Sequence, residues 1–384
     1  MNKMKIISPF LFLFLLFLSQ CFYCFSQDND SFADQKIIPI DTLTIPHEIT
    51  MPASLYSSEY NTQINYYFIE ENDSIKFVYC VDSIMPTSKF YIKEPLNSYL
   101  AINKEKIIVR YYSSKDYLVM NNQSMIIDTL NNNLKIGDNS NIIISSFYYQ
   151  FPIQCKNGEY LVYTELFEPK KDVIFNLDYR KKYYSLPPIS EIKITADDIS
   201  FSKSFGEYPE KYRSEKGMYM SMFFTSINKN NEVFISFYEI DSFYVAKSEK
   251  PTLKFPFKSK FKTSPFHFPD SIDIRDPYNQ SLIASENIGY TYNFFDSYRE
   301  QYYIVVNHTQ KYENEDGTLN DLSQRPWSII VINKDFKQVD EIEMPKHLDK
   351  HKIFIIPEGI AVSDYSLSSE EETVFVVLKI KQYE

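Results

Sequence analysis

The side chains best suited to bind a ligand are concentrated in the C-terminal third of the chain. They are Arg299, Tyr303, His308, Arg325 and Trp327, the last being the only tryptophan. A guanidinium group binds anions, and an aromatic ring stacks on a flat ligand or a cation. On one sheet these five residues could form a binding site, and we treat them as the candidate binding residues. The alternative is structural, with the arginines tying strand edges together and the tryptophan anchoring a hairpin.

The other polar residues do not have the spacing of a catalytic or metal centre. Of the five histidines, His347 and His351 have the i, i+4 spacing that places two imidazoles on one face of a helix. Lysines flank both of them, however, and would oppose a cation. The Asp and Glu residues are scattered, so no acid/base pair for glycoside cleavage can be recognised. We therefore predict no metal and no cofactor, assign no catalytic residue, and favour a protein that is not an enzyme.

The composition excludes several classes of protein. The 384 residues include 40 Lys and Arg against 51 Asp and Glu, a formal net charge of -11. We expect no nucleic-acid binding, which requires clustered cations. The 7 glycines stand far apart, which excludes a phosphate loop, a dinucleotide fingerprint and a G-x-S-x-G elbow. The 32 tyrosines and 31 phenylalanines favour cross-strand packing.

The first residues of the chain predict export. Two lysines precede the apolar run 6–18, as in a signal peptide. Its end can be read in two ways: a lipoprotein signal over 1–20 with Cys21 lipidated, or a signal over 1–26 with cleavage after Ser26. Gln20 stands where a lipoprotein signal usually has a small residue. Retention as a membrane span is a third alternative. We expect an exported protein of the periplasm or outer membrane, which touches the membrane only through a lipid anchor.

Two further cysteines, Cys80 and Cys155, lie in apolar, strand-like segments. An oxidising compartment would permit a disulfide between them. Free cysteine is also a common small residue of protein cores, and we favour that interpretation.

The body of the chain has the pattern of an all-β protein. Short runs rich in Ile, Val, Tyr and Phe alternate with clusters of Asn, Asp, Ser and Lys, and asparagine is expected to form many of the turns. The segments 101–109, 153–163 and 226–235 share one plan, in which two apolar strands flank a polar turn that contains lysine. A second hairpin follows, as in 329–345. These repeats predict small four-stranded antiparallel sheets, which are stable when they stack in a ring.

We therefore predict a single β-propeller domain over 27–384, with six blades of four antiparallel strands. The approximate blades are 60–97, 98–145, 146–200, 201–270, 271–346 and 347–384. The last unit is too short for four strands, so the strand-like segment 36–50 is expected to complete it and close the ring. A β-sandwich is the alternative.

Four motifs over residues 285–384 resemble those of a known family. They are DSYREQYY at 296–303, RPWSIIV at 325–331, Met344-Pro345 and PEGI at 357–360. The arrangement resembles an uncharacterised domain-of-unknown-function family of exported, often lipoprotein-type six-bladed β-propellers from gut-type Gram-negative bacteria. Ile304 stands where an arginine is expected. The resemblance implies a fold and a compartment but no established activity.

These observations predict a non-catalytic binding or scaffolding propeller at the bacterial cell envelope, with an envelope protein or a glycan as its partner. Two alternatives remain. A propeller enzyme acting on carbohydrate, as a glycoside hydrolase or lyase, would be recognised in the hydrolase case by two carboxyl groups about 5 to 9.5 Å apart. A structural subunit of an envelope complex would show a contiguous exposed apolar patch.

Overall fold

The computed structural model describes residues 37–380 with several gaps. The gaps are 58–60, 72–73, 93–95, 112, 114–115, 134–142, 145–152, 157–158, 165, 168–180, 182, 197, 215–222, 248–249 and 263–275. The predicted export segment, with Cys21 and Ser26, lies outside the described residues. Within the described part of the chain, no helix is long and apolar enough to cross a membrane.

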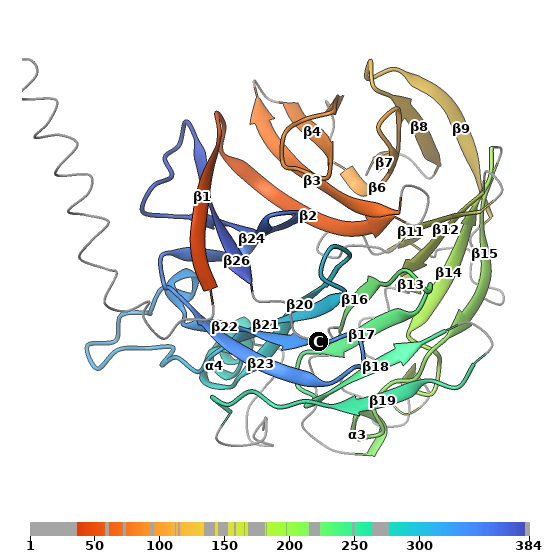
Figure 1. The fold of residues 1–384 in the computed structure, drawn as a ribbon. Helices are drawn as coiled ribbons and strands as arrows, with labels where there is room; N and C mark the ends of the chain where they lie inside the picture. Colours follow the sequence, from red (N-terminus) through yellow and green to blue (C-terminus); the bar gives the residue numbers. More distant parts are fainter. Residues whose placement is uncertain are drawn as a thin grey trace, which may run out of the picture.

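The described strands form six four-stranded antiparallel sheets around a common centre, which confirms the predicted β-propeller (Figure 1). We number the blades in chain order. Blade 1 holds β2 (Ile49–Ser57), β3 (Thr62–Glu71), β4 (Ser74–Val81) and β5 (Ser88–Ile92); blade 2 holds β6 (Leu96–Asn103), β7 (Lys106–Tyr111), β8 (Tyr117–Asn121) and β9 (Ile126–Asn133); blade 3 holds β11 (Ile153–Lys156), β12 (Glu159–Thr164), β14 (Ile189–Ile194) and β15 (Asp198–Phe205).

The second half of the ring is built in the same way: blade 4 holds β16 (Phe223–Ile227), β17 (Val233–Phe237), β18 (Ser242–Ala246) and β19 (Leu253–Pro256); blade 5 holds β20 (Gly289–Asp296), β21 (Gln301–Asn307), β22 (Trp327–Ile332) and β23 (Gln338–Met344); blade 6 holds β24 (Leu348–Ile356), β25 (Gly359–Asp364), β26 (Thr373–Ile380) and β1 (Ile37–Ile45).

Blade 6 contains strands from both ends of the chain. β1 pairs antiparallel with β26, from Ile37 opposite Ile380 to Ile45 opposite Thr373. β1 lies within the segment 36–50 that the sequence assigned to this blade. The register shifts between Pro39 and Asp41, so β1 contains a bulge.

Two blade boundaries differ most from the predicted ones. Blade 1 begins at Ile49 with β2, whereas the sequence pattern suggested a start near residue 60. β2 contains Pro52 beside a register shift, so it lacks the regular alternation of a strand. Blade 3 extends through β15 to Phe205. Short parallel pairings join β2 to β11 and β9 to β15, and they link blades 1 to 3 into one continuous sheet.

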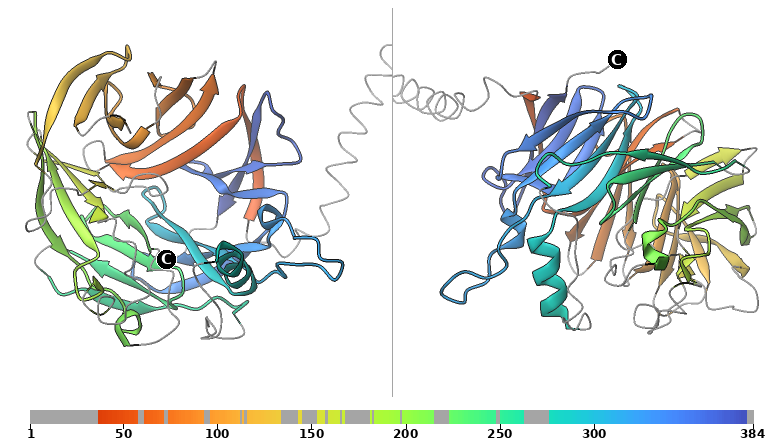
Figure 2. Two further views of the ribbon diagram at one scale, coloured as in Figure 1. Left: turned by 180° about the vertical axis from the view of Figure 1, so that it is seen from behind. Right: turned by 90° about the horizontal axis from the view of Figure 1, so that it is seen from below.

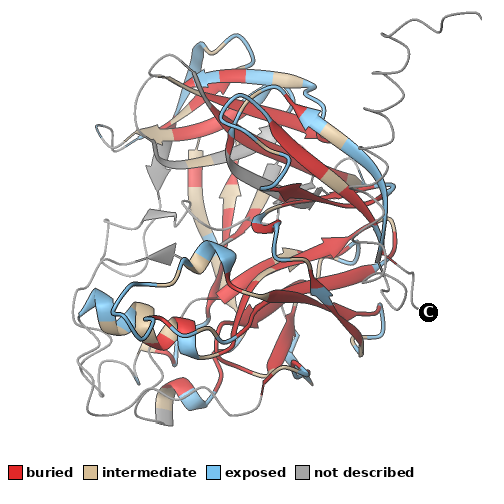
Figure 3. Ribbon diagram, turned by 90° about the vertical axis from the view of Figure 1, so that its left-hand side faces the viewer, coloured by how far each residue is buried: buried red, intermediate tan, exposed pale blue. Residues whose placement is uncertain are grey.

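The middle strands are buried because each blade packs against two neighbours. Every residue of β17, β21, β22 and β25 is buried. Blades 4 and 5 share a hydrophobic cluster that includes Phe234, Phe243 and Tyr302. Blades 6 and 1 share another, which includes Phe354 and Tyr67. Figure 3 shows buried residues along the strands and exposed residues at the turns and outer edges.

The two ends of blade 5 differ. At one end lie the helix α4 (Pro277–Glu286) and the long loop 308–326, which contains the 3-10 helix η2 (Leu322–Gln324) (Figure 2). The Tyr278 hydroxyl donates to a Glu313 carboxylate oxygen at 2.6 Å and so joins α4 to this loop. At the other end the strands are joined by short turns, and these turns carry the candidate site. The remaining elements are the short helix α3 (Lys211–Ser214) and the pair β10 (Ile143–Ile144) and β13 (Leu166–Phe167).

Candidate binding site

Three hairpins in the described part of the propeller use the same asparagine-anchored turn. In blade 4 the turn begins at Asn228, whose Oδ1 accepts hydrogen bonds from the backbone N–H groups of Asn230 and Glu232. In blade 5 the Asn333 Oδ1 accepts hydrogen bonds from the backbone N–H groups of Asp335 and Lys337, which also lie two and four residues further on. In blade 2 the turn begins at Asn121 and has the same pair of bonds. This confirms the predicted use of asparagine in the turns.

The fourth residue of each turn has a left-handed backbone. Ser124 and Asn231 fill this position in blades 2 and 4, with φ of 62° and 59°. Blade 5 has Phe336 there, with φ of 61°. A bulky residue is rare in this conformation, which costs about 1 to 2 kcal/mol. The Phe336 ring packs on Phe255, with ring centroids 4.9 Å apart, and this packing offsets part of the cost.

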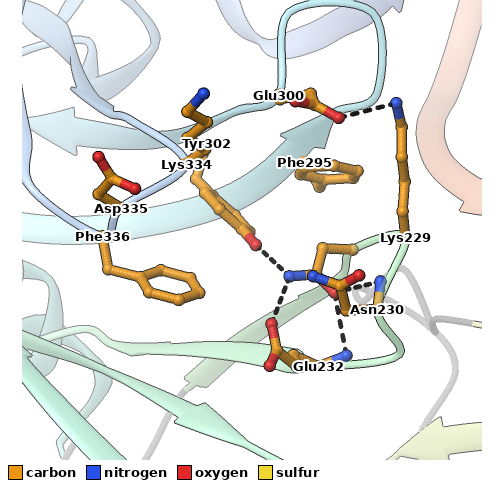
Figure 4. Close-up of a pocket in the computed structure, with 10 residues that line it drawn as sticks. Lys229, Asn230, Glu232, Phe295, Glu300, Tyr302, Lys334, Asp335 and Phe336 are labelled. Carbon is orange, nitrogen blue, oxygen red and sulfur yellow. Dashed lines mark hydrogen bonds and ion pairs between the residues drawn. The ribbon is translucent and has the colours of Figure 1, made fainter. Parts of the chain in front are cut away.

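A pocket of about 430 Å³ lies where the turns of blades 4 and 5 meet (Figure 4). We call it the blade 4–5 pocket. It is lined by Asn228, Lys229, Asn230, Glu232, Phe295, Glu300, Tyr302, Lys334, Asp335 and Phe336. Phe295 and Tyr302 come from β20 and β21, and the other residues come from the β16–β17, β20–β21 and β22–β23 turns. The pocket therefore depends on the packing of two blades, and neither blade contains it alone.

The floor of the pocket is buried and formed largely by aromatic rings. One hydrogen bond at this floor joins the two blades. Asn228 Nδ2 donates to the Tyr302 hydroxyl at 2.6 Å and to Glu232 Oε2 at 2.9 Å. The Tyr302 ring stacks on Phe234 of blade 4, with centroids 4.6 Å apart. Burial raises the pKa of Tyr302 above its ordinary value, so this side chain is a neutral phenol at physiological pH.

The rim of the pocket carries charges of both signs. Lys229 Nζ of blade 4 lies 3.1 Å from Glu300 Oε1 of blade 5, so an ion pair spans the two turns. The two side chains are 37% and 50% exposed, so the pair contributes between about 0 and 1 kcal/mol to stability. Lys334 and Asp335 are exposed on the β22–β23 turn.

Two of the sequence-predicted residues hold the β20–β21 turn that carries Glu300. Arg299 Nη1 donates to Asp296 Oδ2 at 2.5 Å, and Nη2 donates to the Pro357 carbonyl oxygen of blade 6 at 2.9 Å. The Tyr303 hydroxyl donates to the same carboxylate oxygen of Asp296 at 2.9 Å. Both side chains are buried. In this structure Arg299 therefore fixes the turn against blade 6.

His308 and Arg325 lie at the opposite end of blade 5. His308 Nε2 lies 2.9 Å from Ser328 Oγ. Burial, followed by the nearby Arg325 charge, lowers the pKa of His308 to about 4. The Arg325 guanidinium donates to the carbonyl oxygens of His308, Ala284 and Asn287 and so ties α4 to the long loop.

The fifth predicted residue, Trp327, is 1% exposed. Its Nε1–H donates to the Leu348 carbonyl oxygen of blade 6 at 3.1 Å. The structure therefore divides the five predicted residues between the two ends of blade 5, and none of them lines the blade 4–5 pocket. A ligand-binding role for them stays a prediction. The pocket residues were missed, although the similar segments Asn-Lys-Asn at 228 and Asn-Lys-Asp at 333 were a signal for them.

The remaining sequence predictions concern a metal site, the histidines His347 and His351, and the two cysteines. Within the described part of the chain, no group of three or more His, Cys, Asp or Glu side chains could hold a metal ion. His347 Nε2 lies 3.7 Å from Asp364 Oδ2, whereas His351 Nδ1 lies 3.2 Å from the Tyr292 hydroxyl. Cys80 is free and buried between blades 6 and 1, and burial raises the pKa of its thiol to about 12. The side chain of Cys155 lies outside the described part of the structure.

Comparison with known proteins identifies the fold. No protein-family model matches the chain, and no curated protein matches it. The crystal structure of a DUF4221 family member from Bacteroides vulgatus aligns with a TM-score of 0.67 and 16% identity, over 90% of this chain and 98% of that chain. This match is consistent with the resemblance to an uncharacterised propeller family.

Two other solved structures align less well. A Bacteroides fragilis protein described as exported has a TM-score of 0.41 and 10% identity, over 91% of this chain and 96% of that one. Virginiamycin B lyase from Staphylococcus aureus has a TM-score of 0.35 and 9% identity, over 89% and 99%.

Proposed function

We propose that the protein is a non-catalytic binding propeller of the bacterial cell envelope, and that it binds its ligand in the blade 4–5 pocket. The observation that carries the proposal is the construction of this pocket. A buried aromatic floor is held in place by the hydrogen bond between Asn228 and Tyr302, and a polar rim stands above it on three short turns. Most small-molecule sites combine an apolar lining with a few fixed polar groups in this way.

The carboxylates of the pocket favour binding over hydrolysis. A glycoside hydrolase needs one carboxyl group that delivers a proton and a second that attacks or activates water. Of the three carboxylates that line the pocket, Glu300 is ion-paired with Lys229, Glu232 accepts a hydrogen bond from Asn228, and Asp335 is exposed on its turn. We therefore propose that these carboxylates recognise a ligand.

The location rests on the N-terminal sequence. The apolar run 6–18 after two lysines supports export, and Cys21 offers a lipid anchor in the periplasm or at the outer membrane. The propeller begins with β1 at Ile37, so a short segment would connect such an anchor to the fold.

The location is tested on the full chain produced in a Gram-negative host. We expect the protein in the membrane or periplasmic fraction, with a mature N-terminus at lipidated Cys21 or at Gln27 by mass spectrometry. A cytoplasmic protein that retains Met1 would contradict the envelope assignment.

The pocket is tested by retention of envelope components on the immobilised protein. Lys334→Ala changes the rim, whereas Lys337→Ala changes an exposed lysine of the same turn that does not line the pocket. We expect the first variant to lose the retained component and the second to keep it. Equal retention by both variants would contradict the assignment of the pocket.

A further inference from the structure

We propose that the ligand of the blade 4–5 pocket is an uncharged saccharide of roughly one or two pyranose rings. This inference rests on the proposed binding function and specifies its ligand. The sugar would lie with one ring face on Phe336, next to the buried rings of Phe295 and Tyr302, and we call these three rings the aromatic wall (Figure 4). Its hydroxyl groups would reach the rim.

The aromatic wall suits a sugar because a pyranose ring has an apolar face edged by C–H groups. The faces of aromatic rings carry negative charge and attract such polarised hydrogens. Tyr302 and Phe295 are 2% and 5% exposed, whereas Phe336 is half-buried. Phe336 therefore offers the most accessible ring of the wall.

The rim offers hydrogen-bond donors and acceptors in similar number. Donors come from Lys229, Asn230 and Lys334, and acceptors come from Glu232, Glu300 and Asp335. A hydroxyl group both donates and accepts, so a polyol can use such a mixed rim fully. Phosphate would require concentrated cations, and a cationic peptide would require concentrated carboxylates. The mixed signs of the rim charges therefore favour an uncharged ligand.

The size of the pocket limits the ligand. Its volume of about 430 Å³ is near the lower end of the range for small-molecule sites, about 300 to 1,000 Å³. A short saccharide, or the terminal rings of a longer glycan, fits this volume. The exposed Lys229–Glu300 pair contributes little to stability, so a sugar hydroxyl can replace one of its partners at low cost.

The backbone of Phe336 distinguishes this turn from the two similar turns of blades 2 and 4. The two sister turns place Ser124 and Asn231 at the same left-handed position, where small polar residues are tolerated best. Blade 5 places a phenylalanine there instead, and its ring lines the pocket. Strained residues that persist in a fold are concentrated at binding sites. We therefore assign Phe336 as the residue that determines the preference for a sugar ring.

The test is calorimetric titration of the full chain, purified in detergent because of its apolar N-terminus. The probes are the neutral disaccharides cellobiose, maltose, lactose and N,N′-diacetylchitobiose, a glucuronic-acid disaccharide, and inorganic phosphate. We expect at least one neutral disaccharide to bind. Phe336→Asn and Lys334→Ala should each weaken its affinity about tenfold or more, while Lys337→Ala leaves it unchanged.

Phe336→Asn recreates the residue of the blade 4 turn, so the turn should keep its shape, and the melting temperature of each variant verifies the fold. Binding of only glucuronate or phosphate would overturn the inference, as would neutral binding that Phe336→Asn leaves intact. If none of the saccharides binds but an envelope component is retained by the wild type and lost by Lys334→Ala, the saccharide is wrong while the binding function holds. If Lys334→Ala also retains that component, both fail.

Discussion

The Tyr302 hydroxyl of blade 5 accepts a 2.6 Å hydrogen bond from Asn228 Nδ2 of blade 4. Asn228 also organises its own turn through Oδ1, so one side chain fixes both the hairpin and the contact between the blades. The geometry of the pocket and the stability of the blade interface therefore depend on the same residue.

We expect Asn228→Ala to destabilise the protein more than Asn121→Ala. Both variants lose the two side-chain bonds of the same type of turn, but Asn228 Nδ2 also donates to Glu232 and, across the blades, to Tyr302. A buried hydrogen-bonding group left without its partner costs about 1 to 3 kcal/mol. The difference between the two free energies of unfolding in urea should fall in this range. Equal destabilisation would show that the contact between the blades contributes nothing.

Glu341 should be important for stability. Its carboxylate oxygen Oε1 accepts hydrogen bonds from Ser259 Oγ and Ser328 Oγ at 2.7 and 2.6 Å, and Oε2 accepts one from the Lys260 backbone. These bonds fasten the segment after β19 to blade 5. We expect Glu341→Gln to lower the free energy of unfolding by about 2 to 3 kcal/mol, because hydrogen bonds to a charged group are lost.

Glu343→Gln is the matched control for Glu341→Gln. It removes an exposed carboxylate of the same strand and should change the free energy of unfolding by less than about 0.5 kcal/mol. Similar losses in the two variants would contradict the proposed role of the buried carboxylate.

His308 should make stability depend on pH. Burial and the nearby Arg325, Lys260 and Lys350 charges lower its pKa from 6.5 to about 4. Between these values the unfolded chain binds a proton that the folded chain does not, so stability decreases as pH falls from about 6.5 to about 4. The full decrease is up to about 3 kcal/mol, because one pKa unit corresponds to about 1.4 kcal/mol.

The measurement for His308 compares urea unfolding at pH 7 and pH 5. The wild type and His47→Gln should lose stability over this interval, and His308→Gln should lose distinctly less. His47 is a suitable control because it lies between β1 and β2, far in the sequence from His308 and from the charged residues around it. An unchanged pH dependence in His308→Gln would rule out this histidine as its source.

Replacing Phe336 by asparagine or by alanine should change the stability of the protein to different extents. Both substitutions remove the ring and its packing on Phe255. Asparagine tolerates a left-handed backbone better than alanine, whose penalty there is about 1 to 2 kcal/mol. We therefore expect Phe336→Asn to be more stable than Phe336→Ala by about 1 kcal/mol in urea unfolding. The reverse order would mean that the turn changes its conformation when the ring is removed.

Cys80 should be unreactive in the folded protein. Its thiol is buried, and burial raises its pKa to about 12, whereas the thiolate is the reactive form. Iodoacetamide at pH 8 should modify Cys80 only after unfolding, as followed by peptide mass spectrometry. Rapid modification of the native protein would show that the interface between blades 6 and 1 opens readily.

The fold could be predicted largely because its signals are local. The three repeated segments coincide with the hairpins β6–β7, β11–β12 and β16–β17, where apolar runs flank a polar turn. The start of the first blade was harder to predict from the sequence, because β2 contains Pro52 and a register shift. The pattern that identifies a strand is interrupted there.

The candidate site could not be predicted in the same way. Arg299 and His308 are close in sequence, but β21 lies between them, and a strand of 7 residues extends roughly 20 Å. They therefore lie at opposite ends of one blade. The Asn228 and Asn333 turns are distant in sequence and meet only because blades 4 and 5 pack together. Local patterns describe each turn, but the pocket depends on how the blades are arranged.

The pairing of β1 with β26 has a consequence for synthesis and secretion. Because Ile37 lies opposite Ile380, blade 6 cannot be assembled until residue 380 has left the ribosome. Contacts between such distant residues also form slowly. If the chain is exported, as we propose, the pairing of β1 with β26 would also delay the completion of blade 6 until after translocation.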